Sequence, residues 1–236
     1  MERGRHHLQD ARQALDHARP RRARAGRGRG PDRAADAGRQ LCRLLHRRLG
    51  RSHHRRDVLR RGPSVDALVK QGVALESTKS MGNTKEATVQ ETADGRWRLF
   101  YEYALEDSSR VGLAIGPGVA GPWSEQPTPF KPRTGEWDNW HLSTGPMLME
   151  DPNRPVMFYN GATHDARWRI GWVAFDRDCT RVVDRCIEPL IVPPPAEDRA
   201  ATDIAFAASV VTEDRRIWLY YSLEDRRLAR ACIRRG

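Results

Sequence analysis

The segment GRWRLFYEY at residues 95–103, with RVGLA at 110–114, predicts two paired β-strands and decides the fold because it occurs in three copies. The second copy is RPVMFYNG at 154–161 with RIGWVA at 169–174, and the third is RRIWLYYS at 215–222 with RLARA at 227–231. The equivalent residues Tyr101, Tyr159 and Tyr221 set a period of about 60 residues. Such a period indicates stacked units that share a core, and it favours a β-propeller.

Each copy contains the strands of one propeller blade. Asp94-Gly95 is the predicted hairpin turn of the first copy, because glycine tolerates a positive φ angle. Residues 150–154 and 212–215 take its place in the next two copies, while the region of Trp123 and residues 181–184 supply a fourth, outer strand. Residues 65–75 read as the tail of an earlier blade. The prediction is an all-β, incomplete propeller of about three full blades plus part of another.

Composition divides the chain near Gly62. Residues 1–62 hold 19 of the 41 basic residues, 6 of the 31 acidic residues and 6 of the 8 histidines, with no lysine and no aromatic residue. Such a segment cannot bury enough apolar surface to offset the entropy of the chain. We therefore expect a disordered or non-native Arg-rich segment at 1–62 and a partial β-propeller glycosidase domain at 63–236.

Three interpretations of residues 1–62 stay open. The first is a disordered tail, and the second is a basic arm that neutralises the phosphates of nucleic acid or an acidic membrane. The third, which we prefer, is that these residues are not native protein. Arg, Ala, Gly, Pro and His without Ile or aromatic residues is what a GC-rich gene yields in the wrong reading frame. An artefact would then stand where the first blade should be, and nucleic acid is not the partner we expect.

Several classes of protein are disfavoured. No stretch approaches the roughly 20 apolar residues of a membrane span, and the N-terminus lacks the apolar segment of a secretory signal, so we expect a cytoplasmic protein with no membrane partner. The four cysteines, Cys42, Cys179, Cys186 and Cys232, show no C-x-x-C spacing, so neither zinc nor a redox motif is indicated. Cys179 and Cys186 could pair across two strands, but buried free thiols are preferred. The oligomeric state is not indicated.

One carboxylate precedes the first strand of each copy. Glu86, Asp138 and Asp203 stand in an equivalent register before apolar strands. The innermost strands of a propeller line its central channel, so these carboxylates are expected to converge there. Glycoside cleavage needs one carboxyl group to protonate the leaving oxygen and a second to activate water or phosphate. The alternative for any one of them is a turn or strand-edge carboxylate that a backbone amide holds.

Further polar and aromatic residues accompany these carboxylates. Trp137 and Trp140 flank Asp138 and precede His141, and aromatic faces suit the apolar faces of sugars, although one of the two tryptophans is expected to pack between blades. Arg167 and Arg169 can bring guanidinium groups to the channel or form salt bridges between blades. Lys85 beside Glu86 would favour the charged carboxylate if the two touch.

At these residues the chain resembles glycoside hydrolase family 130, the β-1,2-mannosidases and β-mannoside phosphorylases. The resemblance covers roughly residues 65–236 and rests on KEATV (85–89), GPW (121–123), WHLSTGP (140–146), VMFYNGA (156–162), WRIGW (168–172), EPLI (188–191), DIAF (203–206) and LYYS (219–222) with Asp225. It implies a five-bladed propeller that acts on β-mannoside oligosaccharides without a metal. No cofactor is implied, apart from inorganic phosphate if the enzyme is a phosphorylase.

The resemblance also implies residue roles. Glu86 stands where the family commonly has an Asp, and the predicted catalytic residues are Glu86, Asp203 and Asp138. The first two share the acid and base roles. The predicted substrate-binding residues are Lys85, Trp140, His141, Asn160, Arg167, Arg169, Tyr221 and Asp225. Because Asn160 replaces a histidine that helps the phosphorylases bind phosphate, inverting hydrolysis is preferred over phosphorolysis. The alternative from another class is a propeller that binds carbohydrate without cleaving it.

Overall fold

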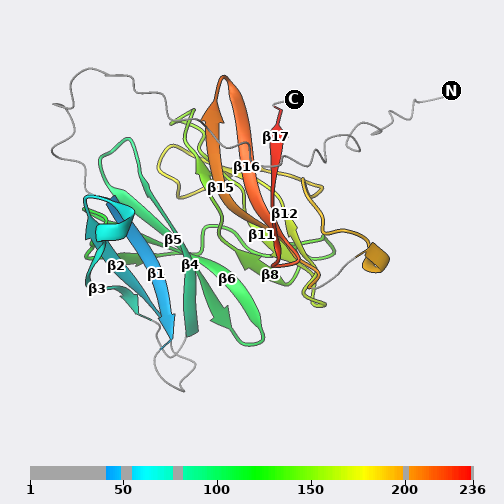
Figure 1. Cartoon of the computed structure of the whole chain (residues 1–236), viewed down its shortest axis with the longest axis horizontal. Helices are drawn as coiled ribbons and strands as arrows, with labels where there is room; N and C mark the ends of the chain where they lie inside the picture. Colours follow the sequence, from blue (N-terminus) through cyan, green and yellow to red (C-terminus); the bar gives the residue numbers. More distant parts are fainter. Residues whose placement is uncertain (1–40, 49–54, 77–81, 199–201, 235–236) are drawn as a thin grey trace, which may run out of the picture. The chain divides into compact units, whose positions relative to one another are not determined.

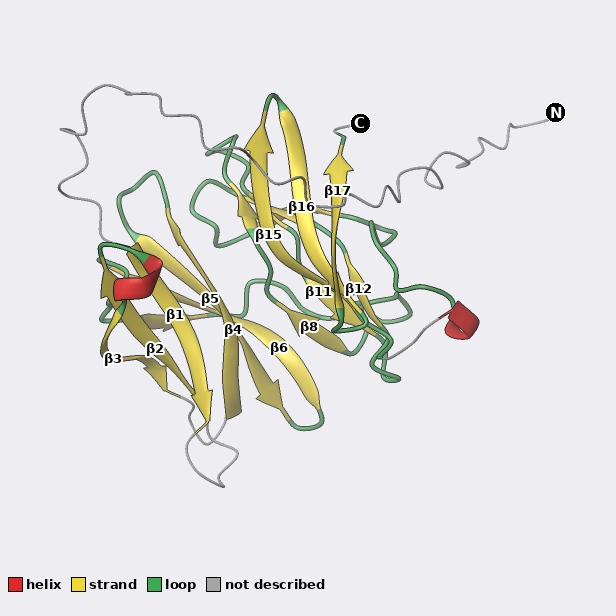
Figure 2. Ribbon diagram, in the orientation of Figure 1, coloured by secondary structure: helices red, strands yellow, loops and turns green. Residues whose placement is uncertain are grey.

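The structure, a computed structural model, describes residues 41–48, 55–76, 82–198 and 202–234. These residues form antiparallel sheets, which confirms the all-β part of the predicted fold class (Figure 2). Within the described ranges the only helical segments are two 3-10 turns, η1 (Val65–Ala67) and η2 (Ala196–Asp198). None of these segments is long and apolar enough to cross a membrane.

The first unit is a three-stranded sheet in the order β1 (Leu41–Arg48), β2 (Arg55–Gly62) and β3 (Val69–Glu76) (Figure 1). The predicted tail of a blade at 65–75 is thus η1 and β3. The expectation of disorder up to residue 62 is wrong for β1 and β2, which pair with each other over eight residues. Average composition hid short apolar pairs such as Leu44-Leu45 and Val58-Leu59, and Leu59 is buried. The rest of the Arg-rich segment lies outside the described residues.

The second unit contains the first aromatic copy. Its sheet runs in the order β4 (Gly82–Glu91), β5 (Trp97–Leu105), β6 (Ser108–Gly116) and β7 (Ser124–Gln126). The predicted turn forms at Thr92–Gly95, where Gly95 has a φ angle of +74° and its N–H donates to the Thr92 carbonyl at 2.9 Å. The predicted strand pair and outer strand are therefore confirmed in this copy.

In the third unit three long strands are each interrupted once, and a fourth strand is continuous. One sheet holds β8 (His141–Ser143), β11 (Asn160–Ala162) and β12 (Trp168–Ile170), and the other holds β9 (Met147–Leu148), β10 (Val156–Met157), β13 (Val173–Phe175) and β14 (Val182–Arg185). The two ladders follow one another along the same chain segments, because residues 141–143 pair with 160–162 and residues 147–148 pair with 156–157. At the interruption Gly145 approaches the Phe158 carbonyl so closely that a Cβ atom has no room.

The fourth unit contains the third copy, as β15 (Ala205–Glu213), β16 (Arg216–Leu223) and β17 (Arg227–Ile233) in that order. A bulge between Ala207 and Ser209 shifts the register of β15 against β16. Bulges bend and re-aim a strand, and they are frequent near functional sites. The first strands of the last three units are therefore β4, β8 with its continuation β9, and β15.

The hydrophobic core lies between neighbouring units. Phe100 and Leu113 of the second unit pack with Tyr159 and Phe175 of the third, and Ile170 of the third packs with Leu219 of the fourth. Burying each such side chain is worth about 1.5–3 kcal/mol. Among the described cysteines, Cys179 and Cys186 are buried and free, which confirms that expectation, and Cys232 is exposed.

Candidate functional site

The second and fourth units are each hydrogen-bonded to the third unit. Thr144, which follows β8, donates its hydroxyl to the carbonyl of Glu86 in β4, and Thr88 donates to the Gly145 carbonyl at 3.0 Å. On the other side, the Trp168 N–H of β12 donates to the carbonyl of Asp203 at 3.0 Å. The segments that carry Glu86 and Asp203 are therefore both fastened to the third unit.

Glu86 has an unusual backbone conformation. Its φ angle is +51°, in the left-handed region that side chains other than Gly, Asn and Asp rarely adopt, and β4 shifts register on both sides of Lys85. A non-glycine residue in this region costs on the order of 1 kcal/mol, and such residues cluster at functional sites. The bulged start of β4 re-aims the half-buried Glu86 side chain.

Lys85 pairs with a carboxylate that the sequence reasoning missed. The Lys85 ammonium lies 3.0 Å from Oε1 of Glu102, on the neighbouring strand β5, and Glu102 is only 3% exposed. Oε2 of Glu102 makes no hydrogen bond of ordinary geometry to the described residues. The signal for Glu102 in the sequence was its position as a charged residue between Tyr101 and Tyr103, which are both buried in the structure. Lys85 therefore forms its ion pair with Glu102. The sequence had left open a contact between Lys85 and Glu86 instead.

Burial raises the pKa of Glu102 above its ordinary value near 4.5, while Lys85 and the Ser143 hydroxyl act to lower it, and the net direction is upward. Replacing Glu102 by Gln is therefore expected to raise the melting temperature more at about pH 8 than at about pH 5. Above pH 4.5 the folded chain still holds a proton that the unfolded chain has released. Stability consequently falls as the pH rises through the folded pKa, and Gln carries no such group. Thermal unfolding at both pH values measures the difference.

The matched control is Glu106→Gln, which removes an exposed carboxylate from the β5–β6 turn. Its effect on the melting temperature is expected to be small and equal at the two pH values. If the gain from Glu102→Gln is also independent of pH, the Glu102 carboxyl group does not titrate abnormally and our interpretation of its burial is wrong.

His141 is held with a defined hydrogen-bonding role. The Ser109 N–H lies 3.2 Å from Nδ1 of His141, so Nδ1 accepts and the proton of the neutral ring is on Nε2. Burial lowers the pKa of His141, and the nearby charges of Arg110 and Lys85 lower it further. The ring stacks on Trp168 with centroids 5.5 Å apart. A neutral His141 can therefore offer an N–H group to a sugar hydroxyl.

Asp203 and the two predicted arginines also lie together. Arg167 Nε is 3.6 Å from Oδ1 of Asp203, and Arg169 donates to the Arg167 carbonyl at 3.1 Å. Burial lowers the pKa of Arg169, and the charge of Arg167 adds to this effect. Trp168 connects this group to His141, because its ring stacks on His141 and meets Phe206 edge-on.

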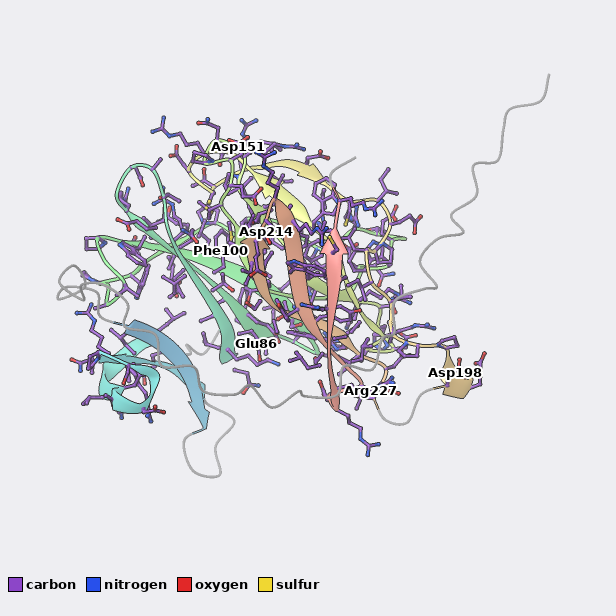
Figure 3. The ribbon with its side chains drawn as sticks, turned by 45° about the horizontal axis from the view of Figure 1, so that its top comes forward. Glu86, Phe100, Asp151, Asp198, Asp214 and Arg227 are labelled. Atoms are coloured by element: carbon purple, nitrogen blue, oxygen red, sulfur yellow. The ribbon has the colours of Figure 1, made fainter. Side chains whose placement is uncertain are left out.

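Six of the predicted residues lie either in the third unit or on segments that are hydrogen-bonded to it. We call this set, together with Glu102 and Trp168, the inner-strand site; the predicted members are Lys85, Glu86, His141, Arg167, Arg169 and Asp203. In Figure 3, Glu86 and Arg227 lie toward one end of the strands, and Asp151 and Asp214 mark turns toward the other. The inner-strand site therefore lies at the end opposite the first hairpin turns of the third and fourth units.

Asp138 does not belong to this site, which corrects the sequence prediction. It is 0% exposed, and its carboxylate accepts hydrogen bonds from Arg133 at 3.0 and 3.1 Å, from the Tyr159 hydroxyl at 2.5 Å and from Arg185. A carboxylate with two arginine partners and no exposed surface cannot meet a substrate. Trp137 stacks on Tyr159 and donates to the Ile187 carbonyl, so it is the predicted tryptophan that packs in the core.

Asn160 is likewise an internal link. Its Nδ2 donates to the Thr144 carbonyl at 2.7 Å, and its Oδ1 accepts the Ala207 N–H at 2.7 Å. The amide group therefore bridges the first strands of the third and fourth units, and it is fully buried. The predicted contact with a sugar is inconsistent with this geometry, because both ends of the amide are already bonded to backbone.

The two remaining predicted residues, Tyr221 and Asp225, belong to the third copy and have different surroundings. Tyr221 is half-buried against the core between the third and fourth units, and burial raises its pKa. Asp225 is exposed in the β16–β17 turn. Its neighbour Glu224 is instead buried, and the Glu224 N–H donates to the Ile204 carbonyl at 2.8 Å, next to Asp203. The sequence missed Glu224 because a turn carboxylate beside another is expected to be exposed.

Comparison with solved structures shows a shared fold. A β-1,2-mannobiose phosphorylase from Listeria innocua, in complex with β-1,2-mannobiose, matches with a TM-score of 0.62 at 19% identity over 80% of this chain and 56% of that one. A second match comes from the GH130 family of mannoside phosphorylases, which is described as containing glycoside hydrolases that target β-1,2 mannosidic linkages in Candida mannan. It has a TM-score of 0.62 at 18% identity, over 82% of this chain and 61% of that one.

A family 43 (GH43_1) enzyme from Xanthomonas citri, complexed with xylose, matches with a TM-score of 0.58 at 13% identity over 82% of this chain and 66% of that one. The chain thus spans 56–66% of the lengths of these three structures. At these identities the likeness shows the fold, which is the propeller-type fold of glycoside hydrolases. No protein-family model and no curated protein matches the chain.

Proposed function

We propose that this chain belongs to a glycosidase of the family 130 type that cleaves β-mannosides by inverting hydrolysis, with Glu86 and Asp203 as the acid and base pair. The observation that carries the proposal is the inner-strand site. The segments that carry two carboxylates, from different units, are fastened to the same third unit by hydrogen bonds from Thr144 to the backbone carbonyl of Glu86 and from Trp168 to the backbone carbonyl of Asp203. Cleavage by this mechanism needs such a pair on opposite sides of the sugar ring.

The chemistry follows from the two carboxyl groups. The protonated one gives its proton to the glycosidic oxygen as the bond to the anomeric carbon breaks. The ionised one takes a proton from the water that attacks the opposite face of that carbon, so the product has the inverted configuration. Lys85, held by Glu102, and Arg167, beside Asp203, supply positive charge close to the pair. The Nε2–H group of His141 is available to a sugar hydroxyl.

The substrate class is proposed as a neutral β-mannoside, for two reasons. Trp168 and His141 stack on each other in the third unit, to which the segments of both carboxylates are bonded, and such aromatic rings pair with the apolar face of a pyranose. The family 130 structures that match this chain include one solved with β-1,2-mannobiose. We also propose that the four units are blades of a five-bladed propeller, of which the chain supplies a part.

Phosphorolysis is the second candidate, because Lys85, Arg167 and Arg169 could hold a phosphate ion near the carboxylates. The position that is a phosphate-binding histidine in the phosphorylases is here Asn160, whose amide is committed to backbone groups. This commitment favours water as the attacking group.

The test is to incubate the full chain with β-1,2-mannobiose, with and without inorganic phosphate, and to identify the products by chromatography. Our proposal expects mannose in both samples at equal rates. Mannose 1-phosphate that forms only with phosphate would establish the second candidate instead. Binding of the disaccharide without either product would establish a carbohydrate-binding protein and overturn the proposal.

A further inference from the structure

Two turns from different units converge on Trp140, beside the inner-strand site. The β5–β6 turn of the second unit carries Asp107, and the β11–β12 turn of the third carries His164. Nε2 of His164 lies 3.9 Å from Oδ2 of Asp107, and the His164 ring meets the Trp140 ring edge-on with centroids 4.8 Å apart. We call Asp107, Trp140 and His164 the Trp140 rim.

The backbone of Trp140 is fixed from both sides. Its N–H donates to the Ala162 carbonyl at 3.1 Å, and its carbonyl accepts a hydrogen bond from Arg110 at 2.6 Å. The indole is half-buried, whereas the side chains of His164 and Asp107 are 74% and 66% exposed. The rim therefore presents a preset aromatic ring with two accessible hydrogen-bonding groups at its edge.

Chain connectivity joins the rim to the inner-strand site. His141 follows Trp140 directly, and the charges of His164 and Asp107 both act on its pKa, so the two groups are close neighbours. The Ser109 N–H that holds His141 and the Arg110 side chain that holds Trp140 come from the same hairpin as Asp107. The β5–β6 hairpin of the second unit thus holds both His141 and Trp140 through hydrogen bonds.

We propose that the Trp140 rim binds the second sugar ring of the substrate, the one that leaves when the glycosidic bond breaks. This inference rests on the proposed function of the inner-strand site. The ligand is a neutral pyranose whose apolar face lies on the indole and whose vicinal hydroxyls bond to Asp107 and His164. The Asp107 carboxylate disfavours a phosphorylated or otherwise anionic sugar.

The fold itself does not require the polar members of the rim. An exposed ion pair of this kind contributes roughly 0–1 kcal/mol to stability, and at 3.9 Å the Asp107–His164 contact is long. Replacing Asp107 and His164 by Ala is therefore expected to leave folding intact, and these two variants are suitable for a binding test.

The experiment uses calorimetric titration of mannose and of β-1,2-mannobiose into the full chain that carries Asp203→Asn, so that bound disaccharide is not turned over. Adding Asp107→Ala and His164→Ala is expected to weaken the binding of mannobiose about tenfold, as for the loss of hydrogen bonds with a charged group, and to leave mannose binding unchanged. The matched control is Asp184→Ala, which breaks the exposed pair with Arg154 on the third unit. It should change neither affinity.

The outcomes separate the two proposals. If the affinities for both sugars fall together or stay unchanged, or if neither sugar binds, the rim is not the site of the second sugar ring. If mannobiose binding depends on the rim while the unmodified chain cleaves nothing, the rim stands and the proposed function fails. If the chain cleaves mannobiose with a KM that the rim variants do not alter, the proposed function stands and the rim proposal fails.

Discussion

Replacing Asp138 by Ala is expected to lower the free energy of unfolding by about 3–5 kcal/mol, the usual cost of removing one partner from a buried ion pair. The carboxylate binds Arg133 from its own loop, Tyr159 from the interruption between β10 and β11, and Arg185 from the end of β14. One side chain thus fastens the loop before β8 to two separate strands of the third unit.

The loss is large because the partners cannot all turn to solvent. The Arg185 side chain is only 10% exposed and lies over the rings of Phe130 and Tyr159, at 4.9 and 4.8 Å from their centroids. Without Asp138 its charge is left in that environment uncompensated. Urea unfolding, followed by tryptophan fluorescence, measures the change.

Asp184→Ala is the matched control, because it removes the carboxylate of an arginine pair in which both side chains are about half exposed. Its cost should not exceed about 1 kcal/mol. If Asp138→Ala is no more destabilising than this control, the buried network does not hold the third unit together, and a role for Asp138 other than a structural one would have to be reconsidered.

Glu86→Gln and Asp203→Asn are each expected to lower kcat/KM on a β-mannoside by about a thousandfold, within the range for the loss of a general acid or base. Both replacements keep the shape of the side chain, and the contacts that hold these segments go through backbone carbonyls, so the fold should persist. Because the two groups act as a unit, the double variant should be little slower than the slower single variant. Initial rates of mannose release measure all three.

Glu106→Gln is the matched control for Glu86→Gln, since Glu106 also has a left-handed backbone, with a φ angle of +55°, but lies exposed in a turn. Its rate should equal that of the unmodified chain. Rates for Glu86→Gln and Asp203→Asn that also equal it would remove both residues from the mechanism, whatever the enzyme cleaves.

The aromatic repeat predicted the strands of three units because a strand with large side chains and a nearby turn is a local signal. In the third unit it could not predict the interruption of the strands at Gly145 and Phe158, which depends on how closely two chains approach. The Arg-rich composition likewise concealed β1 and β2, since these strands pair through backbone hydrogen bonds, which average composition does not reveal.

The positions of the predicted site residues likewise depend on tertiary contacts. Glu86 lies within β4 and Asp203 just before β15, and backbone hydrogen bonds fasten both segments to the third unit. Asp138 precedes β8, and the sequence did not show that Arg133 and Arg185 would surround it. The pairing of Lys85 with Glu102 was also missed, because the partners lie on adjacent strands and are 17 positions apart in the sequence. Burial and pairing of this kind are decided by tertiary contacts.

The most direct test of the account is to follow β-1,2-mannobiose by proton NMR in the presence of the full chain and, separately, of its Asp203→Asn variant. We predict that the α-anomer of mannose appears first with the unmodified chain, as inversion at a β-linkage requires, and that the variant releases none over the same time. Disaccharide that stays intact with the unmodified chain, or equal release by the variant, would contradict the claim that Glu86 and Asp203 cleave β-mannosides.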